Sequence, residues 1–357
     1  MTKKTVWFNK NLSGIYHILG HLKASDAASR FRTLCTHTLP SFIGFCSADC
    51  AEVEPLHIDD EGYLRYCLDV CARHEVAFFF PGRRAAFLAE RRESFDRVGV
   101  RLFTAGDAAT LRLLDRKDRL YAALQAGELA ALVPPHRVVE NAEGFDAAVA
   151  SLREQFDRLC VKPLSGMFGQ GFRVLIDDDE GLNRLLGGDG SKMGLAYFRH
   201  LLAEAGNFRP LLVMPFLDGV ERSVDALAVK GDLLRCVVRR KAHDDGAFQL
   251  IEEHPEAVAA TAALTRALWL DALFNVQFRE HEGKVYLLEI NGRMSGGLVF
   301  SNLTGLDMPY WALRLAAGDC TREEIPMPRT GFYIAQSVQG EVKNRPAATA
   351  AFSGGHG

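Results

Sequence analysis

A glutamate, an asparagine and an arginine occupy alternate positions in one apolar run of the sequence. Glu289, Asn291 and Arg293 stand in the segment Leu287-Leu288-Glu289-Ile290-Asn291-Gly292-Arg293. Because successive side chains of a strand point to opposite faces, the three polar residues project together while their apolar neighbours fill a core. Carboxylate and amide oxygens suit Mg²⁺, and a guanidinium suits phosphate oxygens. The alternative is an ordinary charged strand face exposed to solvent.

A second amide, Gln277, lies on the preceding predicted strand, 274–279. Its relation to Glu289 depends on the loop between the strands. A three-residue loop, 281–283, with Gly283 in the left-handed conformation places Gln277 and Glu289 on one face, whereas a two-residue loop places them on opposite faces. Gly283 favours the three-residue loop. The sequence thus predicts a metal site of Gln277, Glu289 and Asn291.

Two lysines supply the opposite charge. Lys162 ends the predicted strand 159–163 and precedes the glycine-rich segment 165–171, whose amides and neighbouring ammonium group suit nucleotide phosphates. Lys117 opens a predicted helix, where a cation is unfavourable unless an anion lies nearby. For both lysines the alternative is a solvated surface position. The strand-loop-strand context excludes a Walker P-loop. The glycines of the segment are Gly166, Gly169 and Gly171.

An apolar linker joins two further predicted strands and ends on an acid. An extended linker offers one backbone N–H and one carbonyl to an adenine edge, and a terminal carboxylate can accept both ribose hydroxyls. The same composition also fits a simple hairpin corner. The residues concerned are Pro215, Phe216, Leu217 and Glu221.

The elements that must position these groups fall into two patterns. The first hundred residues alternate β-type runs with helical runs, which predicts a parallel sheet and a Rossmann-like lobe. From residue 211 onward, paired strands interrupted by one helix predict antiparallel hairpins. The early strands are 5–8, 33–38, 76–80 and 100–104, with helices 63–74 and 83–98; the later strands are 211–214, 223–230, 233–240, 274–279 and 284–290, with helix 256–270. The turn 9–14 lacks dinucleotide-binding glycines, and Ser13 is placed to cap the helix that follows.

Composition narrows the function classes. The chain has 357 residues, with 42 Lys and Arg against 45 Asp and Glu, so its net charge of −3 argues against a nucleic-acid partner. No apolar run approaches the ~20 residues that span a bilayer, and we expect a cytoplasmic protein without a membrane partner. Cys46/Cys50 and Cys67/Cys71 have i,i+4 spacing, which places both thiols of each pair on one face of a helix. This favours small buried apolar groups over zinc ligands, which more often occur as C-x-x-C.

Considered together, these segments resemble the ATP-grasp superfamily. Their order and spacing are similar to the ATP-binding halves of carbamoyl-phosphate synthase over about residues 110–320. Pro215 stands where that family often has glutamate, and the glycine-rich segment is bulkier than usual. The matching segments are Lys117, 161–163, 165–171, 216–225, 275–278 and 289–293.

The resemblance implies a combined α/β and α+β architecture, an ATP-grasp fold behind a Rossmann-like N-terminal lobe. We expect the lobe at 1–110, the subdomain with the glycine-rich loop at 111–210 and the subdomain with the metal-binding strands at 211–340. The composition of the last residues, rich in Ala, Gly and Pro, predicts a flexible tail at 341–357. Lys117, Lys162 and the loop glycines would hold phosphates. Adenine would meet the Pro215–Leu217 linker and ribose would meet Glu221. Gln277, Glu289 and Asn291 would bind Mg²⁺, with Mn²⁺ as an alternative, and Arg293 and Lys162 would act in catalysis.

The activity implied is ATP-dependent ligation, in which a carboxylate becomes an acyl phosphate and an amine or thiol displaces the phosphate. The alternatives are a nucleotide-binding regulatory protein without turnover and an enzyme similar to biotin carboxylase. We expect small-molecule substrates, a carboxylate and an amine or thiol. A homodimer is the oligomeric state to test. Candidate substrate contacts are the turn 9–14, Arg83, Arg84, Arg239 and Lys241.

Overall fold

The computed structural model describes residues 3–10, 12, 14–166, 170–177, 186–187, 190–241 and 248–337. Contacts divide the chain into two units. The first unit comprises Met1–Arg112, Arg222–Gln277 and Ile290–Gly357, and the second comprises Leu113–Glu221 and Phe278–Glu289. Ser13, Gly169 and the predicted tail 341–357 lie outside the described residues.

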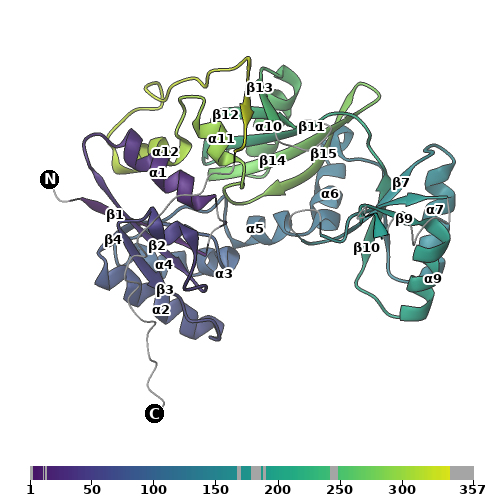
Figure 1. The fold of residues 1–357 in the computed structure, drawn as a ribbon, viewed down its shortest axis with the longest axis horizontal. Coiled ribbons are helices and arrows are strands. Elements are labelled where there is room, and N and C mark those ends of the chain that lie inside the picture. Colours follow the sequence, from purple (N-terminus) through teal and green to yellow (C-terminus); the bar gives the residue numbers. More distant parts are fainter. Residues whose placement is uncertain are drawn as a thin grey trace, which may run out of the picture. The chain divides into compact units, whose positions relative to one another are not determined.

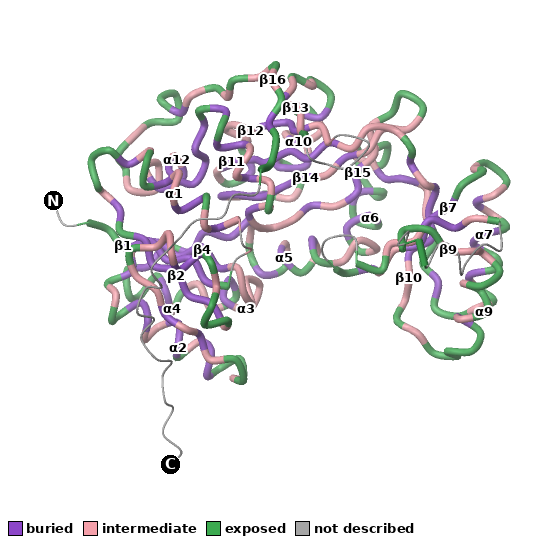
Figure 2. The backbone as a smooth tube through the Cα atoms, in the orientation of Figure 1, coloured by how far each residue is buried: buried purple, intermediate pink, exposed green. Residues whose placement is uncertain are grey.

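The N-terminal part of the first unit is built on a parallel sheet of order β3-β2-β1-β4-β5 (Figure 1). This confirms the predicted Rossmann-like lobe. Trp7 and Phe79 stack at 3.8 Å between ring centroids, and the central strands are buried (Figure 2). The strands are β1 (Lys4–Asn9), β2 (Phe31–His37), β3 (Cys50–Val53), β4 (Val76–Pro81) and β5 (Arg101–Leu102), and the helices are α1 (Ile15–Ser25), η1 (Ile43–Cys46), α2 (Asp60–Arg73), α3 (Ala85–Glu90), α4 (Arg92–Asp96) and α5 (Ala108–Leu114).

Three local expectations for this lobe were wrong. The helix expected over 83–98 is interrupted at Arg91, so α3 and α4 are separate elements. Cys46 ends η1 and Cys50 begins β3, so this pair shares no helical face. The N-cap of α1 is Gly14, without a side-chain hydrogen bond. In contrast, Cys67 and Cys71 are buried on α2 with free thiols, and burial raises the pKa of Cys71 to about 12.

A six-stranded sheet of order β15-β14-β11-β12-β13-β16 follows (Figure 1). The predicted hairpin of β11 and β12 is antiparallel, which confirms it. The pairs β12/β13 and β13/β16 are also antiparallel, although β13 and β16 were not predicted. The strands are β11 (Glu221–Val229), β12 (Asp232–Lys241), β13 (Phe248–Glu252), β14 (Ala272–His281), β15 (Lys284–Asn291) and β16 (Phe332–Ala335), and the helices are α10 (Pro255–Ala267), α11 (Leu298–Asn302) and α12 (Met308–Ala317).

The second unit contains a sheet of order β6-β10-β7-β8-β9. Strand β7 pairs antiparallel with β8, which confirms the predicted strand-loop-strand around the glycine-rich segment. Phe145, Leu159 and Val213 belong to its apolar core. The strands are β6 (Arg137–Val139), β7 (Leu159–Pro163), β8 (Arg173–Ile176), β9 (Lys192–Gly194) and β10 (Leu211–Pro215), and the helices are α6 (Lys117–Gln125), η2 (Ala130–Leu132), α7 (Ala142–Arg153) and α9 (Leu195–Ala205).

The loop between β14 and β15 differs from the prediction. It contains only Glu282 and Gly283, with φ of 50° and 74°, the positive values that a two-residue type I′ turn requires. His281 remains in β14 instead of joining the loop. Its ring lies 3.1 Å from Asp218, and the neighbouring Glu280 N–H donates to the carbonyl of Val220, so the end of β14 is held extended.

In the part of the chain that the structure describes, no helix is long and apolar enough to cross a membrane.

Candidate nucleotide and metal site

Lys162, in the second unit, lies at the centre of a cluster of charged side chains. It sits on β7 opposite Leu212 of β10, and its Nζ is 5.4 Å from the centre of the Phe172 ring. Burial lowers the pKa of Lys162, and the nearby cations Lys117 and Arg279 lower it further. The groups that raise the pKa of Lys162 are Cys160 and Glu289. An ammonium removed from water and flanked by cations favours an anionic ligand.

Lys117 and Glu289 form an ion pair within this cluster. Lys117 Nζ lies 3.1 Å from Glu289 Oε2, with 12% and 23% of the side chains exposed. The backbone N–H of Lys117, the first residue of α6, donates to the carbonyl of Leu164 at 3.0 Å. The start of α6 is therefore joined to the residue that precedes the glycine-rich segment. A predicted phosphate ligand and a predicted metal ligand are in contact.

Tyr121, which the sequence reasoning missed, fixes α6 against β15. Its buried hydroxyl lies 3.0 Å from the carbonyl oxygen of Leu287 and 2.8 Å from that of Leu288, immediately before Glu289. Burial raises the pKa of Tyr121, so the hydroxyl remains a donor. The signal in the sequence was its i,i+4 spacing from Lys117, which places both side chains on one face of α6.

Arg279, also missed, connects the predicted ribose ligand with the predicted adenine linker. Its Nη2 lies 3.2 Å from Glu221 Oε2, and its Nη1 donates to the Leu217 carbonyl at 3.2 Å. The guanidinium is also 5.8 Å from the centre of the Phe216 ring. Arg279 follows Gln277 by two positions on β14, a spacing that places both on one strand face and was the available signal.

The linker itself lies beside the end of β14. Gly219 N–H donates to the carbonyl of Glu280 at 3.1 Å, and a Cβ atom at Gly219 would lie 2.4 Å from that oxygen. Only glycine allows this approach. Phe216 N–H donates to the carbonyl of Arg158, and Pro215 ends β10. Contacts of Pro215, Phe216 and Leu217 with adenine remain a prediction.

The glycine-rich segment is described at its two ends. Gly166 has φ of 148° and Gly171 has φ of 75°, values that side chains with a Cβ rarely adopt. At Gly171 a Cβ would also meet Pro163 Cγ at 2.6 Å. Both positions thus require glycine for the backbone path, and their contacts with phosphate remain a prediction.

Gln277, Asn291 and Arg293 belong to the first unit. Gln277 Nε2 donates to Asn275 Oδ1 at 3.4 Å, and Arg293 Nη1 donates to the Met294 carbonyl at 3.0 Å. Asn291 ends β15 two residues after Glu289, so the two side chains share a strand face. The two-residue turn gives no support for a common face of Gln277 and Glu289. The resemblance alone assigns Gln277 to the metal set.

The donor set fits Mg²⁺ bound together with a nucleotide. Among the described residues, no group of three or more His, Cys, Asp or Glu could hold a metal ion. Glu289 would supply one carboxylate, and Asn291 and Gln277 would supply amide oxygens. Mg²⁺ commonly takes one or two protein carboxylates and completes its shell with substrate phosphates and water.

Three cationic side chains that were candidates for substrate binding form ion pairs or hydrogen bonds within the protein. Arg83 contacts Glu54 at 3.2 Å. Arg84 donates to the carbonyls of Ile58 and Asp59, and both arginines thereby hold the segment after β3. Arg239 is 2% exposed, so its assignment as a substrate contact was wrong. The contact of Lys241 with a substrate remains a prediction.

Part of the chain matches a known protein family, and most of it aligns with a known relative. Residues 207–339 match the family described as ATP-grasp in the biosynthetic pathway with Ter operon. The carbamoyl phosphate synthase large chain of Pasteurella multocida (strain Pm70) is 26% identical over 338 residues, covering 90% of this chain and 28% of the relative. The chain therefore spans less than a third of that relative's length.

Two solved structures share the fold. An L-amino acid ligase from Bacillus licheniformis superposes with a TM-score of 0.61 at 14% identity, over 92% of this chain and 78% of the other. An ADP complex of N5-carboxyaminoimidazole ribonucleotide synthetase gives a TM-score of 0.64 at 12% identity, over 93% and 80%. The chain therefore shares the fold of these two proteins, and its residues 207–339 match an ATP-grasp family.

Proposed function

We propose that this protein is an ATP- and Mg²⁺-dependent ligase that activates a carboxylate as an acyl phosphate for attack by an amine or thiol. The observation that carries the proposal is the cluster around Lys162. Its ammonium is influenced by Lys117, Glu289 and Arg279, and Arg279 in turn contacts Glu221. The second unit thus contains Lys117 and Lys162, expected to hold phosphates, together with the expected metal ligand Glu289 and the expected ribose ligand Glu221.

Each residue has a distinct proposed role. Lys117 and Lys162 would neutralise phosphate oxygens, which restores a favourable environment for two cations held close together. Glu289 would bind Mg²⁺ in place of its ion pair with Lys117. The metal ion would stabilise the negative charge of the transferred phosphoryl group. Glu221 would accept the ribose hydroxyls, and Arg293 would stabilise the charge that develops on the phosphoryl oxygens.

The proposed chemistry has two balanced steps. A carboxylate oxygen of the substrate attacks the γ-phosphorus, the bond to the β,γ-bridging oxygen breaks and ADP leaves. The amine nitrogen or thiol sulfur then attacks the acyl carbon, the bond from that carbon to the phosphate oxygen breaks, inorganic phosphate leaves, and the proton of the nucleophile passes to the phosphate or to water. Excluding water from the acyl phosphate is essential, because hydrolysis would waste ATP without forming product.

An ADP-release assay with pooled amino acids and small carboxylates would identify the substrate class, followed by mass spectrometry of each product. A carboxylate labelled with ¹⁸O then tests the intermediate. Acyl phosphate formation transfers one ¹⁸O into inorganic phosphate, whereas simple ATP hydrolysis transfers none. Nucleotide binding without ADP release for any pool would instead support a regulatory protein.

Several expectations remain proposals. They are the division into segments 1–110, 111–210 and 211–340, a cytoplasmic location, and a homodimer. Mn²⁺ in place of Mg²⁺ is tested in the same ADP-release assay.

A further inference from the structure

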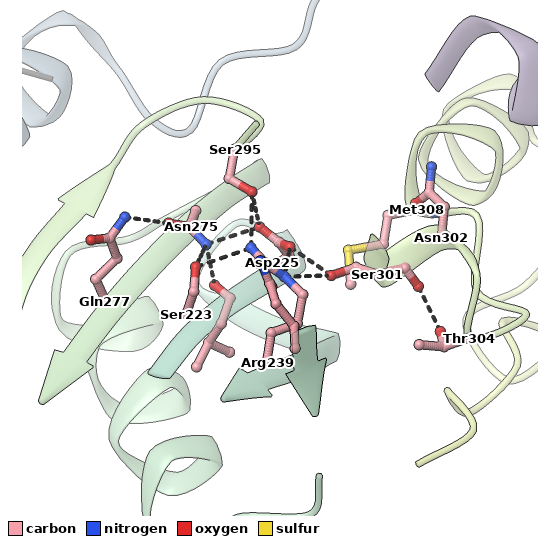
Figure 3. Close-up of polar contacts among 12 residues, drawn as sticks. Ser223, Asp225, Arg239, Asn275, Gln277, Ser295, Ser301, Asn302, Thr304 and Met308 are labelled. Atoms are coloured by element: carbon pink, nitrogen blue, oxygen red, sulfur yellow. Dashed lines mark hydrogen bonds and ion pairs between the residues drawn. The ribbon is translucent and has the colours of Figure 1, made fainter. Parts of the chain in front are cut away.

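A buried ion pair lies beneath the loop that follows β15 (Figure 3). Arg239 Nε of β12 is 3.0 Å from Asp225 Oδ2 of β11, and each side chain is 2% exposed. The pair is surrounded by hydroxyl and amide groups from β11 itself and from other elements of the first unit. These groups belong to Ser223, Gln249, Asn275, Ser295 and Ser301.

The guanidinium uses all three nitrogens inside the protein. Nε also donates to Ser301 Oγ at 3.2 Å, and Nη2 donates to Ser295 Oγ at 3.2 Å. Nη1 donates to Gln249 Oε1 at 2.5 Å. A Cβ atom at Gly297 would lie 2.3 Å from Nη1, so the loop backbone packs directly on the guanidinium.

The carboxylate of Asp225 joins two segments that carry predicted metal and phosphate residues. Oδ1 accepts from Ser295 Oγ at 2.7 Å and from Asn275 Nδ2 at 2.9 Å. Ser295 follows Arg293 by two residues, and Asn275 Oδ1 accepts the hydrogen bond from Gln277. Figure 3 shows Asn275 between Asp225 and Gln277. One buried carboxylate therefore contacts both segments.

Stability alone is a poor explanation for such a pair. Removing two charges from water is costly, and apolar residues of equal volume often stabilise a core as well or better. A saturated polar network does fix its members in one geometry, because any displacement leaves a buried group without a partner.

We infer that Asp225 and Arg239 are positioning residues, which act through Ser295 to hold the segment 291–297 and so place Asn291 and Arg293 for phosphoryl transfer. The inference rests on the proposed function. It attributes the effect on catalysis to the hydrogen bonds that join Ser295 to Asp225 and Arg239.

The network contains a matched control. Ser301 Oγ donates to Asp225 Oδ2 at 2.6 Å and accepts from Arg239, so it mirrors Ser295 in chemistry. Ser301 is on α11, outside the segment after β15, and it is fully buried. Ser301→Ala should therefore cost at least as much stability as Ser295→Ala.

The experiment compares both variants with the unmodified protein. Ser295→Ala should lower kcat for ADP formation at least about tenfold with KM for ATP within about twofold, the pattern of a displaced catalytic group. Ser301→Ala should leave kcat within about twofold. Ser295→Thr, which retains the hydroxyl, should recover most of the rate. Equal kcat losses in both alanine variants would overturn the inference.

Two readouts do not depend on turnover. Hydrogen exchange of amides in 291–297 should rise in Ser295→Ala and stay unchanged in Ser301→Ala. Mn²⁺ binding with ADP, followed by electron paramagnetic resonance, should weaken only in Ser295→Ala. If the unmodified protein forms no ADP with any substrate pool, the proposed function fails, while these readouts still decide whether the network positions the segment.

Discussion

Lys117 and Glu289 are in contact at 3.1 Å although 171 positions separate them in the chain, and each is predicted to bind a different part of MgATP. In this state each side chain neutralises the other. Binding of MgATP would replace one ion pair by two interactions, Lys117 with phosphate and Glu289 with the metal. In the proposed site, the pair would thus neutralise these two charges until the nucleotide binds.

Glu289→Gln should reduce ADP formation by at least about a hundredfold, because the amide removes the only predicted carboxylate ligand while preserving volume. The matched control is Glu282→Gln, which neutralises an exposed carboxylate in the turn of the same hairpin. Both variants should unfold near the temperature of the unmodified protein. Near-normal ADP formation by Glu289→Gln would remove this residue from the metal set.

Nucleotide binding should be coupled to protonation of the Lys162 side chain. Burial lowers its pKa from 10.5, and bound phosphates would raise it again. Nucleotide binding should therefore take up protons at alkaline pH, and affinity should fall as the pH rises through the lowered pKa. Calorimetry of ADP binding in buffers with different ionisation enthalpies measures this uptake.

Lys162→Arg is the control for that linkage, because arginine stays protonated throughout. The variant should bind ADP with the proton uptake abolished. Uptake that persists unchanged in Lys162→Arg would assign the titration to another group.

The sequence predicted the strands and the polar residues better than their connections. Glu289 and Asn291 could be placed on one face of a strand because the alternation of side chains along a strand depends on local sequence alone. The turn at Glu282 was missed because a non-glycine residue with positive φ leaves little trace in one sequence, and here contacts with the linker hold the strand extended through His281. Arg279 was missed because nothing local indicates its partners, Glu221 and the Leu217 carbonyl.

The same limit explains Arg239. Its charge and strand position suggested a substrate contact, but burial is decided by segments remote in sequence. Asp225, Ser295 and Ser301 come from three separate elements, and only the folded chain brings them around the guanidinium.

Gly219→Ala should weaken nucleotide binding by displacing the linker, since the added Cβ would lie 2.4 Å from the Glu280 carbonyl oxygen. The expected loss of stability is about 1–3 kcal/mol. Gly127→Ala is the matched control, because a Cβ there meets nothing within 4 Å. Thermal unfolding and ADP calorimetry measure both effects. Equal ADP affinities for the two variants would separate the linker from the nucleotide site.

Asp307 makes stability depend on pH, and the sign is unusual for a carboxylate. Burial raises its pKa from 3.8 to about 6, against hydrogen bonds from Ser25 and the Tyr310 N–H that lower it. The folded state therefore holds this proton more tightly than the unfolded state. The stabilisation is complete below about pH 4 and is lost as the pH rises through about 6, by about 3 kcal/mol at most.

Asp307→Asn removes this titration and keeps a side chain suited to capping α12. The difference in unfolding free energy, variant minus unmodified protein, should therefore increase between pH 4 and pH 7. Denaturant unfolding at several pH values in that window measures it, and both proteins share every other titrating group, so their contributions cancel. A difference that stays constant across the window would show that Asp307 is ionised in the folded protein throughout, with its charge balanced by Ser25 and the α12 amides.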